Sequence, residues 1–310
     1  MRPLTSRDLR GVWGTLLLPL RDDDSIDAGR LADQLDRLTA AGLNGIYAHG
    51  TAGEFNTLDG DEYDRINELL AAACTTGGVP FQIGASHPSA QATLDRVRRA
   101  KPLAPGAFQV ILPDWLRLHD DEAVAFLTRV AEAADPIPLV LYNPPHAKTP
   151  APPALLRRLT AAVPALIGTK TAGGDRAWFE AMRAAAPDRA IFVPGHTLAS
   201  GLALGAHGSY SNVAALSPAG AVRWYETMVR DPAAGVDIER RIHAFFAAHV
   251  APLQADGLSN PALDRFLAAV GGWADVGTRP RWPLRGAPDH AVAAARRAAR
   301  ALIPELFPHP

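Results

Sequence analysis

The stretch Pro164-Ala-Leu-Ile-Gly-Thr-Lys170 is a short apolar run that ends in a lysine, and it is one of eight such runs in the chain. Amphipathic stretches rich in alanine and arginine separate the runs, a pattern typical of strand–helix units around a parallel sheet. The predicted strands span Val12 to Leu18, Gly45 to His49, Pro80 to Gly84, Ala107 to Leu112, Pro138 to Tyr142, Leu166 to Lys170, Ala190 to Pro194 and Gly208 to Ser211. Eight strands that alternate with helices predict an α/β fold, a closed TIM (β/α)8 barrel.

The segments between and after the strands have the apolar spacing of helices. Asp27 to Ala41 and Ser89 to Lys101 are two examples between strands. Residues 1–220 are predicted to form the barrel, and residues 221–310 the last barrel helix and a C-terminal helical extension. Helical patterning in the extension lies near Ala233 to Gln254, Pro261 to Val270 and His290 to Leu302.

Composition and charge exclude several classes of partner. The formal net charge is −1 and both signs are spread along the chain, so no basic face is present for nucleic acid. No apolar run has the roughly 20 residues that cross a bilayer, and the polar N-terminus shows no signal-peptide pattern. We therefore expect a cytoplasmic protein that binds neither nucleic acid nor membranes.

Lysine is scarce in this chain. Of 31 basic residues, only Lys101, Lys148 and Lys170 are lysine, and the others are arginine. Arginine stays protonated in proteins, whereas a desolvated lysine amine can lose its proton and attack a carbonyl carbon to form an imine. A lysine at the end of a predicted strand in so arginine-biased a chain indicates chemistry.

Three loops at predicted strand ends carry further candidate groups. His49-Gly-Thr-Ala-Gly-Glu54 follows the second strand, and its two glycines are expected to let the backbone turn tightly and expose N–H groups to a carboxylate. The fifth strand ends in Leu141-Tyr142-Asn143-Pro144-Pro145, and the sixth in Lys170-Thr171-Ala-Gly-Gly-Asp175. Reactive groups of such barrels lie at the C-terminal strand ends, so a phenol and an amine are expected on neighbouring strands.

These motifs resemble those of the dihydrodipicolinate synthase and N-acetylneuraminate lyase family, the Schiff-base class I aldolases. The family's glycine loop matches Gly50 to Glu54, its Y-N-x-P strand end matches Tyr142 to Pro145, and its G-x-K-x-x-x-G-D segment matches Gly168 to Asp175. Order and spacing agree over nearly the whole chain. The resemblance implies a TIM barrel and a lyase acting on pyruvate or a related 2-oxo acid, by aldol cleavage, condensation or dehydration.

The resemblance also implies roles for individual residues. Lys170 is the amine that forms the imine, and Tyr142 relays protons with help from the Thr51 hydroxyl. The backbone around Gly50, with the N–H groups of Thr51 and Ala52, binds the 2-oxo acid carboxylate. No metal and no organic cofactor are expected, because the imine itself is the electron sink. The family is commonly tetrameric, which implies a homo-oligomer, a dimer or a tetramer.

Departures from the family pattern bear on the substrate. Where the synthases carry a tyrosine after the fourth strand, this chain has Trp115, and Ala52 lacks the second hydroxyl of the family loop. Lys148 stands where an arginine is usual, and lysine lacks arginine's bidentate fork. These differences predict that the chain is not a true dihydrodipicolinate synthase. Trp115, Lys148 and Tyr210 complete the candidate substrate-binding residues, with packing as the alternative for Tyr210 and a solvated loop charge for Lys148.

Two other functions compete with a lyase. A barrel that keeps 2-oxo acid binding but lacks turnover would act as a sensor or an assembly subunit, and Trp115 and Ala52 motivate this alternative. A phosphate-binding barrel enzyme is less favoured, because the segments after the seventh and eighth predicted strands lack a glycine-rich phosphate loop.

Overall fold

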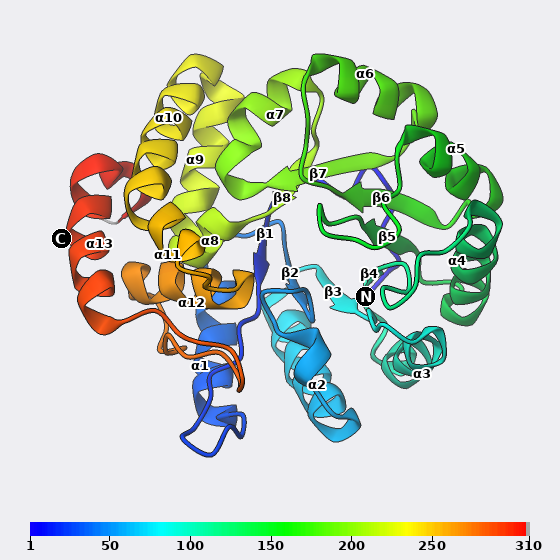
Figure 1. Cartoon of the computed structure of the whole chain (residues 1–310), viewed down its shortest axis with the longest axis horizontal. Helices are drawn as coiled ribbons and strands as arrows, with labels where there is room; N and C mark the ends of the chain where they lie inside the picture. Colours follow the sequence, from blue (N-terminus) through cyan, green and yellow to red (C-terminus); the bar gives the residue numbers. More distant parts are fainter. Residues whose placement is uncertain (308–310) are drawn as a thin grey trace.

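Eight parallel strands close into a barrel in sequence order, with β1 paired to both β2 and β8 (Figure 1). The structure is a computed structural model and describes residues 1–307. The strands are β1 Gly11–Thr15, β2 Gly45–Ala48, β3 Phe81–Gly84, β4 Ala107–Val110, β5 Leu139–Tyr142, β6 Leu166–Lys170, β7 Ala190–Pro194 and β8 Gly208–Tyr210. The predicted TIM barrel is confirmed.

Helices cover the outside of the barrel, and more helices follow it. The barrel helices are α1 Ala28–Thr39, α2 Gly60–Gly77, α3 Ala90–Ala100, α4 Asp120–Ala134, α5 Pro153–Ala162, α6 Arg176–Ala185, α7 Leu198–Leu204, α8 Asn212–Leu216 and α9 Pro218–Arg230. The C-terminal extension contains α10 Pro232–His249, α11 Ala251–Ala255, α12 Asn260–Gly271 and α13 Asp289–Leu302. The predicted boundary between the barrel and the residues that follow it, at residue 220, falls inside α9, which begins at Pro218. The division into these two parts stays a prediction.

The first strand ends earlier than predicted, at Thr15 instead of Leu18. Beyond it, the backbone of Leu17 is held by a side chain: its N–H donates to Gln34 Oε1, and its carbonyl accepts from Gln34 Nε2, both at 2.8 Å. Gln34 is fully buried on α1. An apolar run alone does not reveal that a glutamine, and not a neighbouring strand, satisfies its peptide groups.

The helix predicted over Ala233 to Gln254 is two helices that meet at Val250. Pro252 lies at the start of α11 and has no N–H to continue the hydrogen bonding of α10. The other two helices predicted in the extension appear within one residue of their expected bounds.

The barrel interior is filled by aromatic and aliphatic side chains. Trp13, Tyr47, Phe192 and Tyr210 pack together there, each at most 3% exposed. Leu4 belongs to the same cluster, and its N–H donates to the carbonyl of Gly106, just before β4. The N-terminal segment thus closes the amino-terminal end of the barrel, and the open end is the one where Lys170 and Tyr142 lie.

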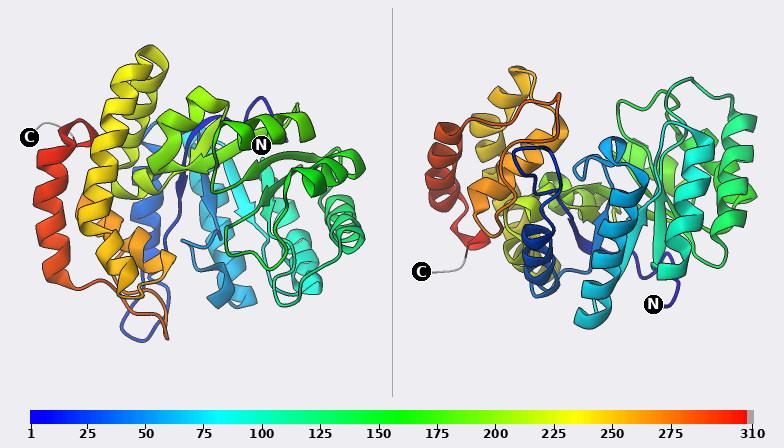
Figure 2. Two further views of the ribbon diagram at one scale, coloured as in Figure 1. Left: turned by 45° about the horizontal axis from the view of Figure 1, so that its top comes forward. Right: turned by 90° about the horizontal axis from the view of Figure 1, so that it is seen from below.

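The extension packs against one flank of the barrel, next to β1 and β8 (Figures 1 and 2). Helix α10 contacts α7 and α9, α12 contacts α8, and α13 lies across α10 and α12. This packing brings α12 to the open end of the barrel. Within residues 1–307, no helix has both the length and the apolarity needed to cross a bilayer.

Candidate active site

The pairing of β5 with β6 places Tyr142 directly opposite Lys170. Leu139 pairs with Leu166, but Val140 pairs with Gly168, so Ile167 is an extra residue in β6. Without this bulge Tyr142 would face Thr169, and a one-residue slip turns side chains to the opposite face of a strand. The irregularity therefore puts the phenol and the amine side by side at the open end of the barrel.

The Lys170 amine lies among three tyrosine rings. Its Nζ atom is 4.1 Å from the ring centroid of Tyr142 and 5.3 Å from the centroids of Tyr47 and Tyr210. Lys170 lines a cavity of about 200 Å³. Within residues 1–307, the amine makes no hydrogen bond of its own, so it is free to react with a molecule in the cavity.

The surroundings of Lys170 favour its neutral form. Burial lowers its pKa to about 8, and the carboxylate of Asp264 raises it again in part. The tyrosine ring faces act in the same direction as Asp264, since they attract a cation. A substantial share of Lys170 is therefore neutral near pH 8, the state that can attack a carbonyl carbon.

The loop from His49 to Glu54 turns by other means than the sequence predicted. Its left-handed residues are His49, with φ 60°, and Glu54, with φ 51°, and neither of the two glycines. The glycines instead allow close approach: a Cβ atom on Gly50 would lie 2.8 Å from the Tyr47 ring, and one on Gly53 would lie 3.0 Å from the Leu16 carbonyl.

Thr51 and Tyr142 connect this loop to the amine. The Thr51 hydroxyl donates to the Tyr142 hydroxyl at 3.4 Å. Burial raises the pKa of Tyr142, and the Thr51 hydrogen bond lowers it in part, so the phenol stays protonated near neutral pH. Both residues line the 200 Å³ cavity and a second cavity of about 50 Å³ beside it.

The structure brings some of the predicted site residues together and leaves others apart. Ala52 and Tyr210 line the larger cavity with Lys170, and the Tyr210 hydroxyl donates to Gln82 Oε1 at 2.6 Å. Gly50 belongs to the loop but does not line either cavity. Trp115 is 80% exposed and Lys148 is also exposed, and neither lines either of these two cavities.

Sequence reasoning missed a carboxylate in the larger cavity. Asp264 on α12 lines this cavity although it is only 8% exposed, and its Oδ2 accepts a hydrogen bond of 2.6 Å from Asn260 Nδ2. Burial raises the pKa of Asp264 to about 6, and Lys170 and Asn260 oppose this shift. The four-residue spacing of Asn260 and Asp264 was the available signal, but nothing in the sequence places α12 over the barrel mouth.

Polar groups from the segments that follow β7 and β8 complete the wall on the side of α12. His196, Ser211 and Asn212 line the larger cavity. Asn212 holds His196 twice, with Nδ2 2.8 Å from the imidazole Nδ1 and Oδ1 accepting from the backbone N–H at 3.1 Å. Because an amide nitrogen only donates, Nδ1 of His196 is the acceptor, and the ring is therefore neutral with its proton on Nε2. Burial lowers the pKa of His196, which favours this neutral ring.

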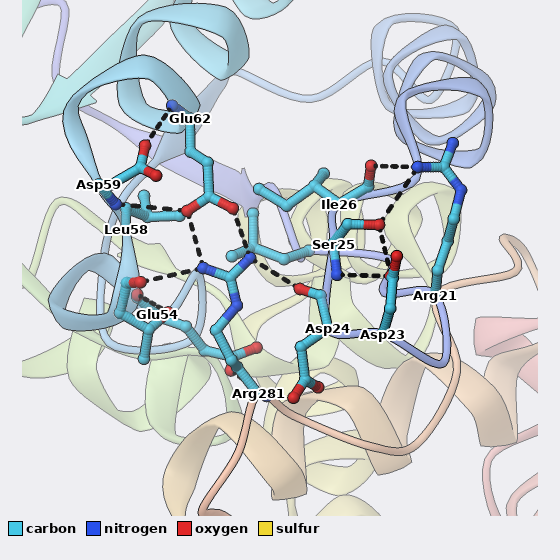
Figure 3. A network of polar contacts seen from close by, with 12 residues as sticks. Arg21, Asp23, Asp24, Ser25, Ile26, Glu54, Leu58, Asp59, Glu62 and Arg281 are labelled. Atoms are coloured by element: carbon cyan, nitrogen blue, oxygen red, sulfur yellow. Dashed lines mark hydrogen bonds and ion pairs between the residues drawn. The ribbon is translucent and has the colours of Figure 1, made fainter.

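A buried ion pair fixes the glycine loop to the extension. Arg265, next to Asp264, donates to Glu54 Oε1 from Nε at 2.9 Å and from Nη2 at 2.5 Å, and both side chains are fully buried. The other Glu54 oxygen accepts from the backbone N–H of Arg281 at 2.7 Å, and the Arg281 side chain pairs with Glu62 (Figure 3). Glu54 thus faces away from the cavities and holds its loop.

Comparison with known families identifies the family to which the chain belongs. The sequence profile of the Dihydrodipicolinate synthetase family matches residues 8–251, a span that includes all eight strands. The chain belongs to this family. The family resemblance predicted from the three strand-end loops is therefore confirmed.

Curated relatives of this family member carry two kinds of name. A 4-hydroxy-tetrahydrodipicolinate synthase of Thermomicrobium roseum is 30% identical over 72% of each chain. An uncharacterized DapA-like lyase of Halobacterium salinarum is 31% identical over 70% of this chain and 71% of the relative. The synthase of Ehrlichia canis is 29% identical over 54% of this chain and 56% of the relative. In that match the chain spans about half the length of the curated relative.

Solved structures share the fold at low sequence identity. YagE of Escherichia coli K12, a prophage protein of the dihydrodipicolinic acid synthase family in complex with pyruvate, superposes with a TM-score of 0.82. It is 20% identical, over 95% of this chain and 98% of that chain. The sialic acid aldolase of Ruminococcus gnavus, solved as a catalytic lysine mutant, has a TM-score of 0.83 at 17% identity, over 99% and 100% of the two chains.

The buried ion pair predicts a large effect on stability. Glu54→Gln leaves the Arg265 guanidinium buried without its counter-charge, and we expect the free energy of unfolding to fall by about 3 to 5 kcal/mol in urea titrations. Asp256→Asn, which removes an exposed ion pair with Arg285, is the matched control and should cost under about 1 kcal/mol. Equal effects of the two variants would contradict this account of the pair.

The position of Lys170 predicts how its amine titrates. With three lysines in the chain, ¹³C-lysine labelling gives a simple NMR spectrum, and Lys170→Arg assigns the signal. We expect a midpoint near pH 8, since burial lowers this pKa. In Asp264→Asn the midpoint should move lower, because the carboxylate that stabilises the ammonium is gone. A Lys170 midpoint above pH 10 would show that the amine is solvated.

Proposed function

We propose that this chain is a lyase of the class I aldolase type, which acts on pyruvate or a related 2-oxo acid through an imine at Lys170. The observation that carries the proposal is the Lys170 amine, which lies 4.1 Å from the Tyr142 ring centroid in a cavity of about 200 Å³. Membership of the dihydrodipicolinate synthetase family supports the same reaction class.

The loop after β2 supplies the groups that would hold the substrate. The backbone N–H groups of Thr51 and Ala52 bind the 2-oxo acid carboxylate, which sets the keto carbon against the Lys170 amine. The neutral amine attacks this carbon and gives a carbinolamine. Tyr142, paired to the Thr51 hydroxyl, transfers a proton to the carbinolamine oxygen, which leaves as water while the imine forms.

The imine then acts as an electron sink. It accepts the electron pair released when the adjacent carbon loses a proton or a carbon substituent, and the product is an enamine. The enamine attacks an aldehyde in the condensation direction, and loss of a hydroxyl group as water gives the dehydratase variant. In this mechanism the protein needs no metal and no organic cofactor, because the lysine supplies the sink.

Other properties of the protein stay predictions. These are a small 2-oxo acid as the main partner, assembly as a homo-dimer or homo-tetramer, a cytoplasmic location and the absence of nucleic acid and membrane partners. The similarity to an uncharacterized DapA-like lyase is consistent with the prediction that the chain is not a true dihydrodipicolinate synthase. Exposed Trp115 and Lys148 contribute to a substrate site only if another subunit or a loop movement brings them to a cavity.

Trapping of the imine tests the function directly. Borohydride added with pyruvate should attach one reduced pyruvate to Lys170, located by peptide mass spectrometry. Lys170→Arg should not be labelled, since a guanidinium does not form the imine. Lys101→Arg is the matched control and should be labelled like the wild type, because Lys101 lies outside the cavities and donates to the Ala133 carbonyl.

Two outcomes separate the lyase from the alternatives. An unlabelled Lys170 across a panel of 2-oxo acids would rule out the imine. Labelling of Lys170 without turnover of any hydroxylated 2-oxo acid would instead favour the sensor or assembly subunit.

Removal of the phenol tests the proton relay. Tyr142→Phe should slow imine formation with pyruvate by about 100-fold, because the hydroxyl that protonates the carbinolamine is lost. Rapid-quench borohydride trapping measures this rate constant. Tyr225→Phe on α9, outside both cavities, is the control and should keep the wild-type rate. A Tyr142→Phe rate within about threefold of the wild type would contradict the relay.

A further inference from the structure

Asp264 is the carboxylate of the larger cavity, and the imine mechanism described above assigns it no contact with the substrate. Among the described residues that line this cavity, Lys170 and Asp264 are the two charged side chains. Lys170 is used for the covalent step. A carboxylate that is 92% buried on a helix outside the barrel strands, yet open to the reaction cavity, calls for a function of its own.

The hydrogen bonds of Asp264 leave one of its oxygens available. Oδ2 accepts from Asn260, and Oδ1 accepts no hydrogen bond from any side chain or backbone group of residues 1–307. A buried carboxylate is stabilised by donors, so Oδ1 favours a molecule that brings one. Hydroxyl groups are such donors, and Ser211 and Asn212 add further hydrogen-bonding groups to the same wall.

The distribution of charge disfavours a second carboxylate on the substrate. The carboxylate of the 2-oxo acid is assigned to the Thr51 and Ala52 N–H groups, and the protonated imine balances Asp264. An additional carboxylate would meet the like charge of Asp264. Among the described residues, no arginine and no lysine other than Lys170 lines either cavity to compensate for it. Asp114 in the smaller cavity adds a further negative charge.

The position of Asp264 is fixed by its neighbour in the chain. Arg265 joins α12 to Glu54 at the end of the glycine loop. The carboxylate and the loop that holds the 2-oxo acid are therefore parts of one rigid arrangement. A fixed acceptor at a set distance from the imine can select one class of reaction partner.

We propose that Asp264 is a specificity-determining residue, which accepts a hydrogen bond from a hydroxyl group of the aldehyde partner and excludes partners that carry a second carboxylate. The substrate class is then a neutral hydroxylated aldehyde, or the hydroxylated 2-oxo acid that it forms with pyruvate. This inference rests on the proposed lyase function and adds the chemical class of the second substrate.

Three four-carbon aldehydes test the proposal in the condensation direction with pyruvate. Erythrose is neutral and hydroxylated, butanal is neutral without hydroxyls, and succinate semialdehyde carries a carboxylate. The wild type should favour erythrose over each of the other two by at least about tenfold in kcat/KM. Asp264→Asn should narrow the erythrose to succinate semialdehyde ratio by about tenfold or more, through a lower KM for the acidic aldehyde.

Asp256→Asn makes the same change of charge in the extension, at an exposed residue outside the cavities, and should keep the wild-type ratios. The wild-type preferences alone remain decisive if Asp264→Asn does not fold. Equal use of erythrose and succinate semialdehyde by the wild type overturns the proposal. So does an unchanged ratio in folded Asp264→Asn, or pyruvate trapped at Lys170 with no hydroxylated aldehyde consumed. Failure of pyruvate trapping overturns the lyase function, and this inference with it.

Discussion

The ion pair between Glu54 and Arg265 joins the two parts of the molecule that form the reaction cavity. Glu54 ends the loop that carries Thr51 and Ala52, and Arg265 lies beside Asp264 on α12. Burying both charges is costly, so we infer that this pair contributes more to fixing one arrangement than to net stability. Here the arrangement that is fixed includes the proposed carboxylate site of the loop and the free carboxylate of the helix.

Two groups of opposite charge, Lys170 and Asp264, are both desolvated in the cavity. Burial lowers the pKa of Lys170 to about 8 and raises the pKa of Asp264 to about 6, and each group partly offsets the shift of the other. The amine therefore remains available as a nucleophile while the carboxylate is still ionised near neutral pH. Three tyrosine rings lie around the amine, within 5.3 Å of its nitrogen.

Local patterns in the sequence were sufficient to predict the barrel and the amine–phenol pair. Period and spacing identify strands and their ends, and parallel strands bring those ends to one face. They do not reveal the extra residue Ile167, which decides that Tyr142 faces Lys170, because a bulge depends on pairing between strands. Nor do they reveal Asp264, whose place over the barrel mouth depends on packing between distant segments. The early end of β1 was also not predictable from local patterns, because the Leu17 backbone bonds to Gln34 on another element.

The groups proposed for the covalent chemistry and those proposed to select the aldehyde come from different parts of the fold. The proposed covalent machinery comes from the ends of β2, β5 and β6, the three segments that match the family motifs. The groups on the other wall come from α12 and from the segments that follow β7 and β8, and they include Asp264 and His196. If the imine is common to the family and the partner is not, substitutions on this second wall should change the choice of aldehyde with less effect on imine formation. On this proposal the extension takes part in the choice of partner, because α12 supplies Asp264, the one acidic side chain among the described residues that line the larger cavity.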